Sequence, residues 1–147
     1  MSVSELLPGN EAVASATDDD PDGIELRIGA KLEQLPIIRS LAATVAIRAD
    51  FDLDSIADLK LAVDEACSTL ITRAVPGTAL TCRFILRDNE IRFMGRVVSA
   101  IDTEPKRDSF GWRVLTTLTD HADSWVNRAE SGYAVHIEII KRKTTGG

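Results

Sequence analysis

Residues 55–73 read SIADLKLAVDEACSTLITR and form the most regular segment of this 147-residue chain. Their apolar residues recur three or four positions apart, a spacing that places them on one face of an α-helix. Asp54 or Ser55 is predicted to cap the start of this helix, and Pro76-Gly77 follows its end. The predicted core-facing stripe consists of Ile56, Leu59, Val63, Ala66, Cys67, Leu70, Ile71 and Ala74.

The segments on either side of this helix predict a sheet and two further helices. Residues 35–45 have helical spacing, and Ser109 is suited to cap a short third helix with Gly111 on its inner stripe. Alternation of apolar with other residues predicts strands, two of them joined in a hairpin at Asp88-Asn89. The predicted strands cover about residues 24–28, 80–86, 91–97, 124–127 and 133–140. This order of elements predicts an α/β two-layer sandwich, a mixed, mostly antiparallel sheet with its helices on one face.

The composition is that of an ordinary globular protein, with 44% hydrophobic and 27% charged residues. A length of 147 residues corresponds to one domain. No apolar run approaches the roughly 18 to 20 residues that a membrane span needs, and the N-terminus lacks the pattern of a secretory signal. We therefore expect a cytoplasmic protein without a membrane partner.

The net charge of −6 is concentrated at the start of the chain. Residues 1–22 hold six acidic residues and no Lys or Arg, so the remaining acids and bases balance. This segment has no periodicity, and we expect a disordered acidic tail at 1–22 followed by a folded domain at 23–143. A solubilising leader is the simpler role for the tail, and a docking segment is the alternative. Because the body is neutral, direct binding of nucleic acid is not expected.

The cysteines and histidines do not form a recognisable site. Cys67 and Cys82 are isolated from each other in sequence and fall on apolar faces, which indicates reduced core residues. His121 and His136 have no ligand spacing around them, so a structural role is expected. No metal site is predicted.

Most catalytic signatures are absent, including the Walker A loop, GxGxxG, GxSxG and HExxH. Residues 58–71 and the order of elements nevertheless resemble the bacterial anti-sigma factor serine kinases of the GHKL ATPase fold, in particular the anti-sigma-F and anti-sigma-B branch. The resemblance covers about residues 24–142 and implies a GHKL-like domain.

The resemblance also implies where a nucleotide site would lie. In that family this helix carries a glutamate that acts as general base, matched by Glu65, and four residues later a magnesium-binding asparagine, replaced here by Thr69. The Asp-x-Gly-x-Gly motif is replaced by residues 96–101, RVVSAI, and the lid shrinks to about 102–108. Gly111 alone remains of the glycine-rich turn that follows. We therefore expect Glu65 to be a relic of a catalytic base, and ATP and magnesium to bind weakly at Thr69 and Gly111. Trp112 and Trp125 are expected to be core anchors.

A partner surface is implied by the same resemblance. In the family an arginine near the start of the first helix contacts both the sigma factor and the anti-anti-sigma protein, and the register places Arg39 there. The planar guanidinium suits this task because it can pair bidentately with carboxylates. The alternative, that Arg39 is an ordinary solvated helix residue, remains open.

Two main functions are compatible with these residues. The first is a regulator that sequesters an alternative sigma factor of the stress or sporulation type and releases it to an anti-anti-sigma protein of the STAS class. The second is an ATP-dependent serine kinase that phosphorylates the anti-anti-sigma protein. A third and more remote function is that of a nucleotide-sensing module of a histidine kinase. The lost nucleotide motifs favour the first. A homodimer is a possible assembly.

Overall fold

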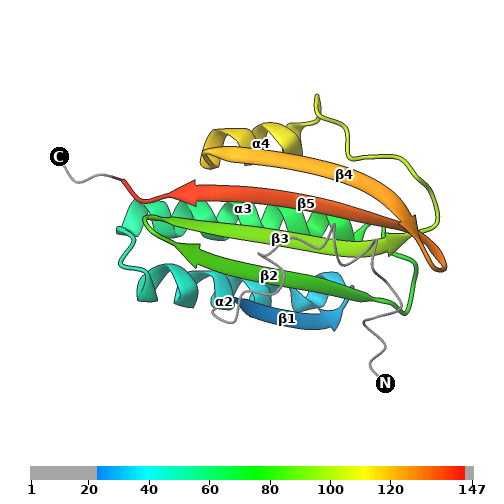
Figure 1. The fold of residues 1–147 in the computed structure, drawn as a ribbon, viewed down its shortest axis with the longest axis horizontal. Helices are drawn as coiled ribbons and strands as arrows, with labels where there is room; N and C mark the ends of the chain where they lie inside the picture. The colour runs from blue at the N-terminus through cyan, green and yellow to red at the C-terminus, as the bar shows by residue number, and fades with distance from the viewer. Residues whose placement is uncertain (1–22, 145–147) are drawn as a thin grey trace, which may run out of the picture.

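A computed structural model describes residues 23–144 of the chain. The predicted acidic tail at 1–22 lies outside the described residues. The elements, in chain order, are β1 (Ile24–Gly29), η2 (Leu32–Gln34), α2 (Leu35–Arg48), α3 (Leu53–Ile71), β2 (Ala79–Arg87), β3 (Glu90–Ser99), α4 (Phe110–Leu118), β4 (His121–Ala129) and β5 (Gly132–Arg142) (Figure 1).

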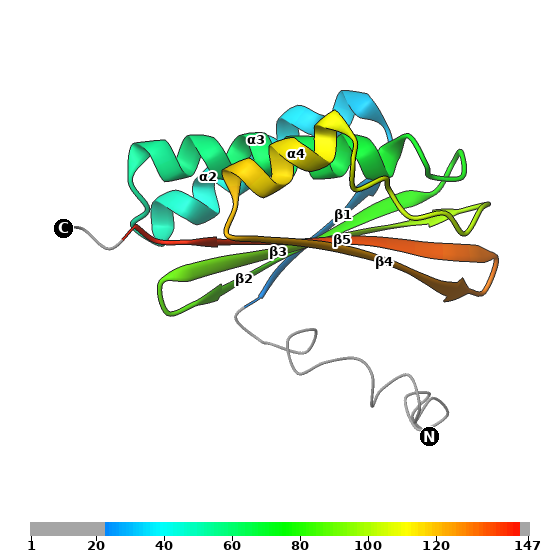
Figure 2. The same ribbon diagram turned by 90° about the horizontal axis from the view of Figure 1, so that it is seen from above.

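The described part of the chain folds into two layers, which confirms the predicted α/β sandwich. Five strands form one sheet in the order β1-β2-β3-β5-β4, and α2, α3 and α4 all lie on the same side of it (Figure 2). The sheet was expected to be mixed, but every strand pair among the described residues is antiparallel. The physical reason is that α2 and α3 form an out-and-back pair, so β2 starts at the end of the sheet where β1 stops and Gly29 pairs with Ala79.

The core lies between the sheet and the helices, with α3 at its centre. Six of the eight residues of the predicted stripe are buried, and Leu59, Val63 and Leu70 have no exposed surface. Ile56 and Ala74 are partly buried against the same core, and Ala74 lies beyond the end of α3. On the sheet, Phe84 and Phe93 pack with ring centroids 5.1 Å apart. Cys67 and Cys82 are buried free cysteines of the same core, as predicted. Among residues 23–144, no helix is long and apolar enough to cross a membrane.

The start of α3 differs from the prediction. The N-cap is Asp52, whose carboxylate accepts a hydrogen bond of 2.7 Å from the backbone N–H of Ser55. Asp52 has the extended backbone geometry of a cap, whereas Asp54 already lies in the first turn of the helix. There its negative charge is attracted to the partial positive charge of the helix N-terminus. At α4 the predicted cap is confirmed, because Ser109 Oγ accepts from the N–H of Trp112 at 3.1 Å.

The two tryptophans have different environments. Trp112 is buried, 8% exposed, as expected of a core anchor. Trp125 is 37% exposed, so the expectation that it anchors the core was wrong. It lies on the sheet face opposite the helices and stacks on His136, with centroids 4.9 Å apart and rings 10° from parallel. The alternation of β4 sends this residue outward, and an aromatic residue alone does not reveal which face of a strand it occupies.

Candidate functional site

Glu65 and Thr69 lie one turn apart on the half-buried face of α3 that turns toward α4. The Thr69 hydroxyl donates a hydrogen bond of 3.3 Å to Oε2 of Glu65, as their spacing allows. Gly111, in the first turn of α4, lies directly against the same carboxylate. A Cβ at Gly111 would collide with Oε2 of Glu65 and lie 3.1 Å from its Cδ. The structure therefore brings all three predicted nucleotide-site residues together.

This contact determines what else fits between α3 and α4. The Glu65 carboxylate lies at the N-terminal turn of α4, where backbone N–H groups and the helix dipole favour a negative charge. A nucleotide phosphate that approached the same turn would meet this carboxylate and be repelled by it. Glu65 would have to rotate away before a phosphate could take its place.

The donors for a magnesium ion are also few. At this point of the fold they are the Glu65 carboxylate and the Thr69 hydroxyl, whose proton is already donated to that carboxylate. Within residues 23–144, no group of three or more His, Cys, Asp or Glu side chains is arranged to hold a metal ion. A magnesium–ATP complex uses carboxylate or amide oxygens together with free space for phosphates, and here one carboxylate and one hydroxyl lie at this point.

Two arginines hold the middle and the C-terminal part of the connection between β3 and α4. Arg73, just after α3, donates hydrogen bonds to the carbonyl oxygens of Thr103 at 2.8 Å and Glu104 at 3.4 Å. Arg107 donates to Asp123 Oδ1 at 2.8 Å and lies 4.8 Å from the centre of the Trp112 ring. The Arg107 guanidinium also lowers the pKa of the Asp123 carboxyl.

Sequence reasoning did not identify these two arginines. Arg73 donates to carbonyl oxygens of the connection, whereas Arg107 belongs to the connection and donates to β4. Sequence spacing carries no signal of either contact. The connection between β3 and α4 is therefore held by the protein's own side chains.

Arg39 lies on α2 and forms an ion pair with Asp64 of α3. Its Nε and Nη2 atoms both donate to Oδ1 of Asp64, at 3.0 and 2.7 Å. The two side chains remain 42% and 30% exposed. Arg39 is thus neither buried nor free in solvent, and its role in partner binding stays a prediction. Sequence spacing does not pair Asp64 with Arg39, because the two residues are 25 positions apart.

The two groups of candidate residues lie on either side of one helix. Asp64 and Glu65 are consecutive on α3, yet Asp64 meets α2 whereas Glu65 meets α4. A change in the position of α3 would move both. The predicted partner residue and the predicted catalytic residue are therefore coupled through a single element.

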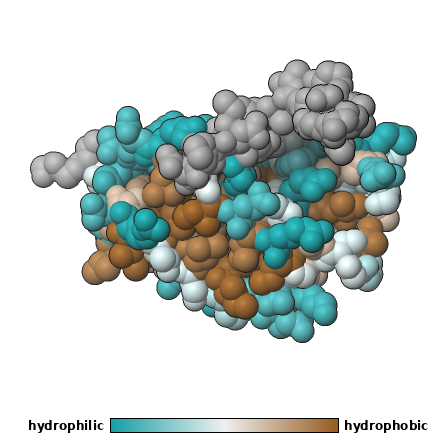
Figure 3. Space-filling view, turned by 60° about the horizontal axis from the view of Figure 1, so that its bottom comes forward, coloured by the Kyte–Doolittle hydropathy of each residue, from teal (hydrophilic) through white to brown (hydrophobic). Residues whose placement is uncertain are grey.

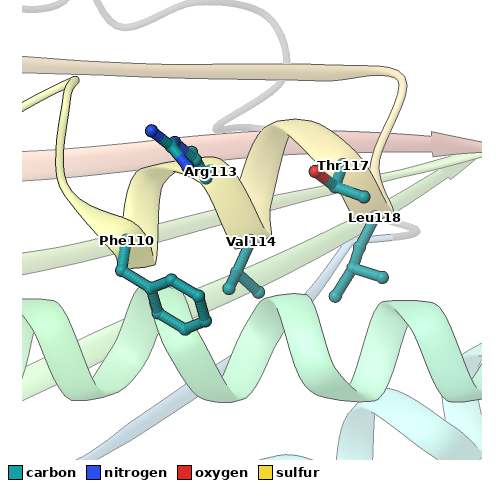
Figure 4. Close-up of a pocket in the computed structure, with 5 residues that line it drawn as sticks. All are labelled: Phe110, Arg113, Val114, Thr117 and Leu118. Carbon is teal, nitrogen blue, oxygen red and sulfur yellow. The ribbon is translucent and has the colours of Figure 1, made fainter.

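A cavity of about 340 Å³ lies along α4 rather than at Glu65. Figure 4 shows Phe110, Val114 and Leu118 of its lining pointing toward α3, with Arg113 and Thr117 at the side. Phe110 is 80% exposed. The buried residues of α4 are Trp112 and Leu115, and Leu118 is partly buried against the core. The cavity is mainly apolar and contains none of the predicted nucleotide residues.

Comparison with known proteins identifies the relatives of this chain. The anti-sigma-F factor RsbW of Mycobacterium tuberculosis is 36% identical over 104 residues, which are 69% of this chain and 61% of that protein. The serine-protein kinase RsbW of Bacillus cereus is 45% identical over 51 residues, 35% of this chain and 32% of that one. No family model matches the sequence.

A solved structure shares the fold. The crystal structure of the RsbU and RsbW domains of Rv1364c from Mycobacterium tuberculosis matches with a TM-score of 0.65 and 12% identity, covering 85% of this chain and 33% of that one. The chain is therefore similar in sequence and in fold to RsbW anti-sigma factors. It spans 61% of the length of its Mycobacterium tuberculosis relatives. This similarity agrees with the two-layer sandwich and with the resemblance seen in α3.

Proposed function

We propose that this protein is an anti-sigma factor of the cytoplasm that sequesters an alternative sigma factor and so represses transcription from its promoters. Competition by an anti-anti-sigma protein of the STAS class would release the sigma factor. The proposal is supported by the relatives, one of which is named an anti-sigma-F factor, and by the shared fold. Binding alone is sufficient for this activity.

The contact between Glu65 and Gly111 is the observation that carries the choice of binding over catalysis. A kinase of this family would hold the nucleotide phosphates and magnesium between α3 and α4 to stabilise the charge of phosphoryl transfer. Here the Glu65 carboxylate fills that space and the connection above it is fastened by Arg73 and Arg107. We infer that ATP binds weakly and that Glu65 has no catalytic task.

Arg39 is the residue we propose for the sigma-factor contact. Its pairing with Asp64 holds the guanidinium in place at the α2–α3 surface, so little rotamer entropy would be lost on binding. A partly exposed ion pair such as Arg39–Asp64 contributes only about 0 to 1 kcal/mol to stability. Arg39 could therefore leave Asp64 and pair with a carboxylate of the partner at little cost in free energy. The same residue would serve the anti-anti-sigma protein, so the two partners would compete.

A homodimer is a further part of the proposal. β1 is an edge strand of the described sheet, and α2 lies beside it. Apolar side chains gather in the middle of the face seen in Figure 3. The exposed large apolar residues of η2 and α2 are Leu32, Ile37 and Ile47. An edge strand flanked by apolar side chains is a common surface for pairing with a second copy.

The alternative function is an ATP-dependent serine kinase that phosphorylates the anti-anti-sigma protein. The observation in its favour is that Glu65 is retained and that relatives are named serine-protein kinases. Incubation of the full chain with labelled ATP, magnesium and STAS proteins of the source organism separates the two functions. We expect no transfer of phosphate above the level of a Glu65→Gln control. Transfer that the wild type performs and the control does not would establish the kinase instead.

The binding function has its own test. The alternative sigma factors of the source organism are titrated one at a time into the full chain, and transcription from the promoter of any that binds is then measured. We expect one of them to bind and its transcription to be inhibited. Absence of binding by every one would refute the anti-sigma proposal.

A further inference from the structure

The face of the sheet that points away from the helices is rich in arginine. This outer face is turned toward the viewer in Figure 1 and lies below the sheet in Figure 2. Strand alternation directs to it six arginines from four strands: Arg27, Arg83, Arg87, Arg92, Arg96 and Arg142. Such a concentration is unexpected in a body whose total charge is zero. The bases of the folded part are therefore unevenly distributed.

The acids on this face do not balance the arginines. Glu25, Glu90, Glu138 and Asp123 alternate onto the same side, and each is already engaged in an ion pair. The partner of Asp123 is Arg107, which adds a further positive charge at the rim. Arg27 and Arg96 are exposed and make no ion pair within residues 23–144. The outer face thus has an excess of positive charge.

Apolar and aromatic side chains lie among these arginines. Ile85 and Ile140 belong to this face and are 0% and 7% exposed, although no described helix covers it. The stacked pair of Trp125 and His136 lies beside Arg96, which is opposite His136 in the strand register. The outer face therefore combines cations with the partly exposed Trp125–His136 stack, a combination suited to an acidic peptide that also carries apolar residues.

The chain itself contains a segment of that chemistry. Residues 1–22, which the structure does not describe, hold six acids, no bases and the apolar residues Val3, Leu6, Leu7 and Val13. The segment joins the fold at Gly23, directly before β1 and therefore at the edge of the outer face. An extended chain of this length reaches up to about 70 Å, whereas the sheet is only about 20 Å across at a strand spacing near 4.8 Å.

We propose that the outer face of the sheet binds the acidic segment 1–22 of the same chain. Opposite charge supplies the attraction, and the covalent link to β1 raises the local concentration of the segment to the order of millimolar. The interaction is sensitive to salt because most of the arginines are exposed. It lies on the opposite side of the sheet from Arg39 and Glu65, so it is independent of sigma-factor binding by the helices.

Paramagnetic broadening in the full chain tests this proposal. A nitroxide is attached to a cysteine introduced by Ser15→Cys, while Cys67 and Cys82, with no exposed surface, stay unlabelled. The methyl group of Met94 reports on the outer face, and the methyl groups of Leu61 report on the helix side. We expect Met94 to be broadened several-fold more than Leu61 at low salt, and the difference to vanish at high salt.

Charge variants give the experiment its controls. Arg27→Glu with Arg96→Glu should abolish the selective broadening, and conversion of the four aspartates of residues 18–22 to lysine in that variant should restore it. Arg48→Glu with Arg113→Glu changes the net charge equally on the helix side and should leave the broadening intact.

Three results would overturn the proposal. Equal broadening of both faces, or broadening that ignores the charge variants, would show that the contact is not specific. Broadening of Met94 in chains without nitroxide, caused by adding chains that carry it, would assign the face to the segment of a second copy. Absence of broadening in every sample would show that the segment does not bind the outer face, and a separate acidic partner would then be the remaining candidate. A sigma-factor titration of the same variants distinguishes failure here from failure of the proposed function.

Discussion

Arg39 connects two helices through one carboxylate and still exposes 42% of its side chain. If it also contacts the sigma factor, Arg39→Ala removes a charge-assisted contact and should weaken binding by roughly 1 to 3 kcal/mol. The melting temperature should change little, because the partly exposed pair with Asp64 adds little stability. Calorimetric titration measures the affinity, with Arg48→Ala as the control for loss of a helix-surface charge. Unchanged affinity would return Arg39 to the role of a solvated helix residue.

Glu65 provides the second test at the scale of a single residue. Glu65→Gln removes the negative charge but keeps an oxygen that can accept from Thr69. Because the proposed function involves no proton transfer, repression by the variant should equal that of the wild type within experimental error. Transcription from a sigma-dependent promoter in vitro provides the measurement. Loss of repression while the circular dichroism spectrum is retained would restore a chemical role to Glu65.

The start of α3 depends on Asp52. Its carboxylate accepts from the N–H of Ser55, and that hydrogen bond is the main reason why the pKa of Asp52 is lowered. Asp52→Ala should therefore reduce the midpoint of urea unfolding more than Asp54→Ala, which removes only an acid of the first turn. An equal effect of both changes would contradict the assignment of Asp52 as the cap.

The β4–β5 pair contains a group that makes stability depend on pH. Burial, and next the charge of Arg96, lower the pKa of His136 from 6.5 to about 4. Between these values the unfolded chain binds more protons than the folded one, so the contribution of His136 is complete above pH 6.5 and is lost as the pH falls toward 4. Allowing for solvent screening, the loss should be about 1 to 2 kcal/mol.

His136→Gln is the matched control for this titration. Glutamine does not titrate, yet it can keep the hydrogen bond that His136 makes with Asn127. Denaturant unfolding at a series of pH values should show a shallower decline for the variant between pH 6.5 and 4. Parallel curves for the two proteins would show that other groups cause the decline.

The elements were largely predictable from the sequence, whereas the contacts between them were not. Alternation and helical spacing located β1 to β5 and the three α-helices because each element buries one continuous face. The same patterns did not place Trp125, since a single aromatic residue fits either face of a strand. They could not pair Arg39 with Asp64 either, because that contact depends on how α2 packs against α3. Glu65, Thr69 and Gly111 were grouped by family resemblance, and the structure places them in contact.

At the scale of the whole molecule, α3 lies between the proposed partner surface and the nucleotide-site residues. If this arrangement serves binding alone, ATP should bind with a dissociation constant on the order of 0.1 mM or weaker, near −5.5 kcal/mol. Magnesium should add little because Glu65 and Thr69 supply few ligands. Calorimetry with ATP, with and without magnesium, measures both values. Micromolar affinity that requires magnesium would show that Glu65 turns away from Gly111 to admit phosphates.

We propose that this protein holds a sigma factor without nucleotide chemistry. The most direct test is a calorimetric titration of the sigma factor into the full chain, first without nucleotide and then with saturating magnesium–ATP. We expect the same dissociation constant in both titrations, within about twofold. Binding that appears only in the presence of magnesium–ATP would contradict it.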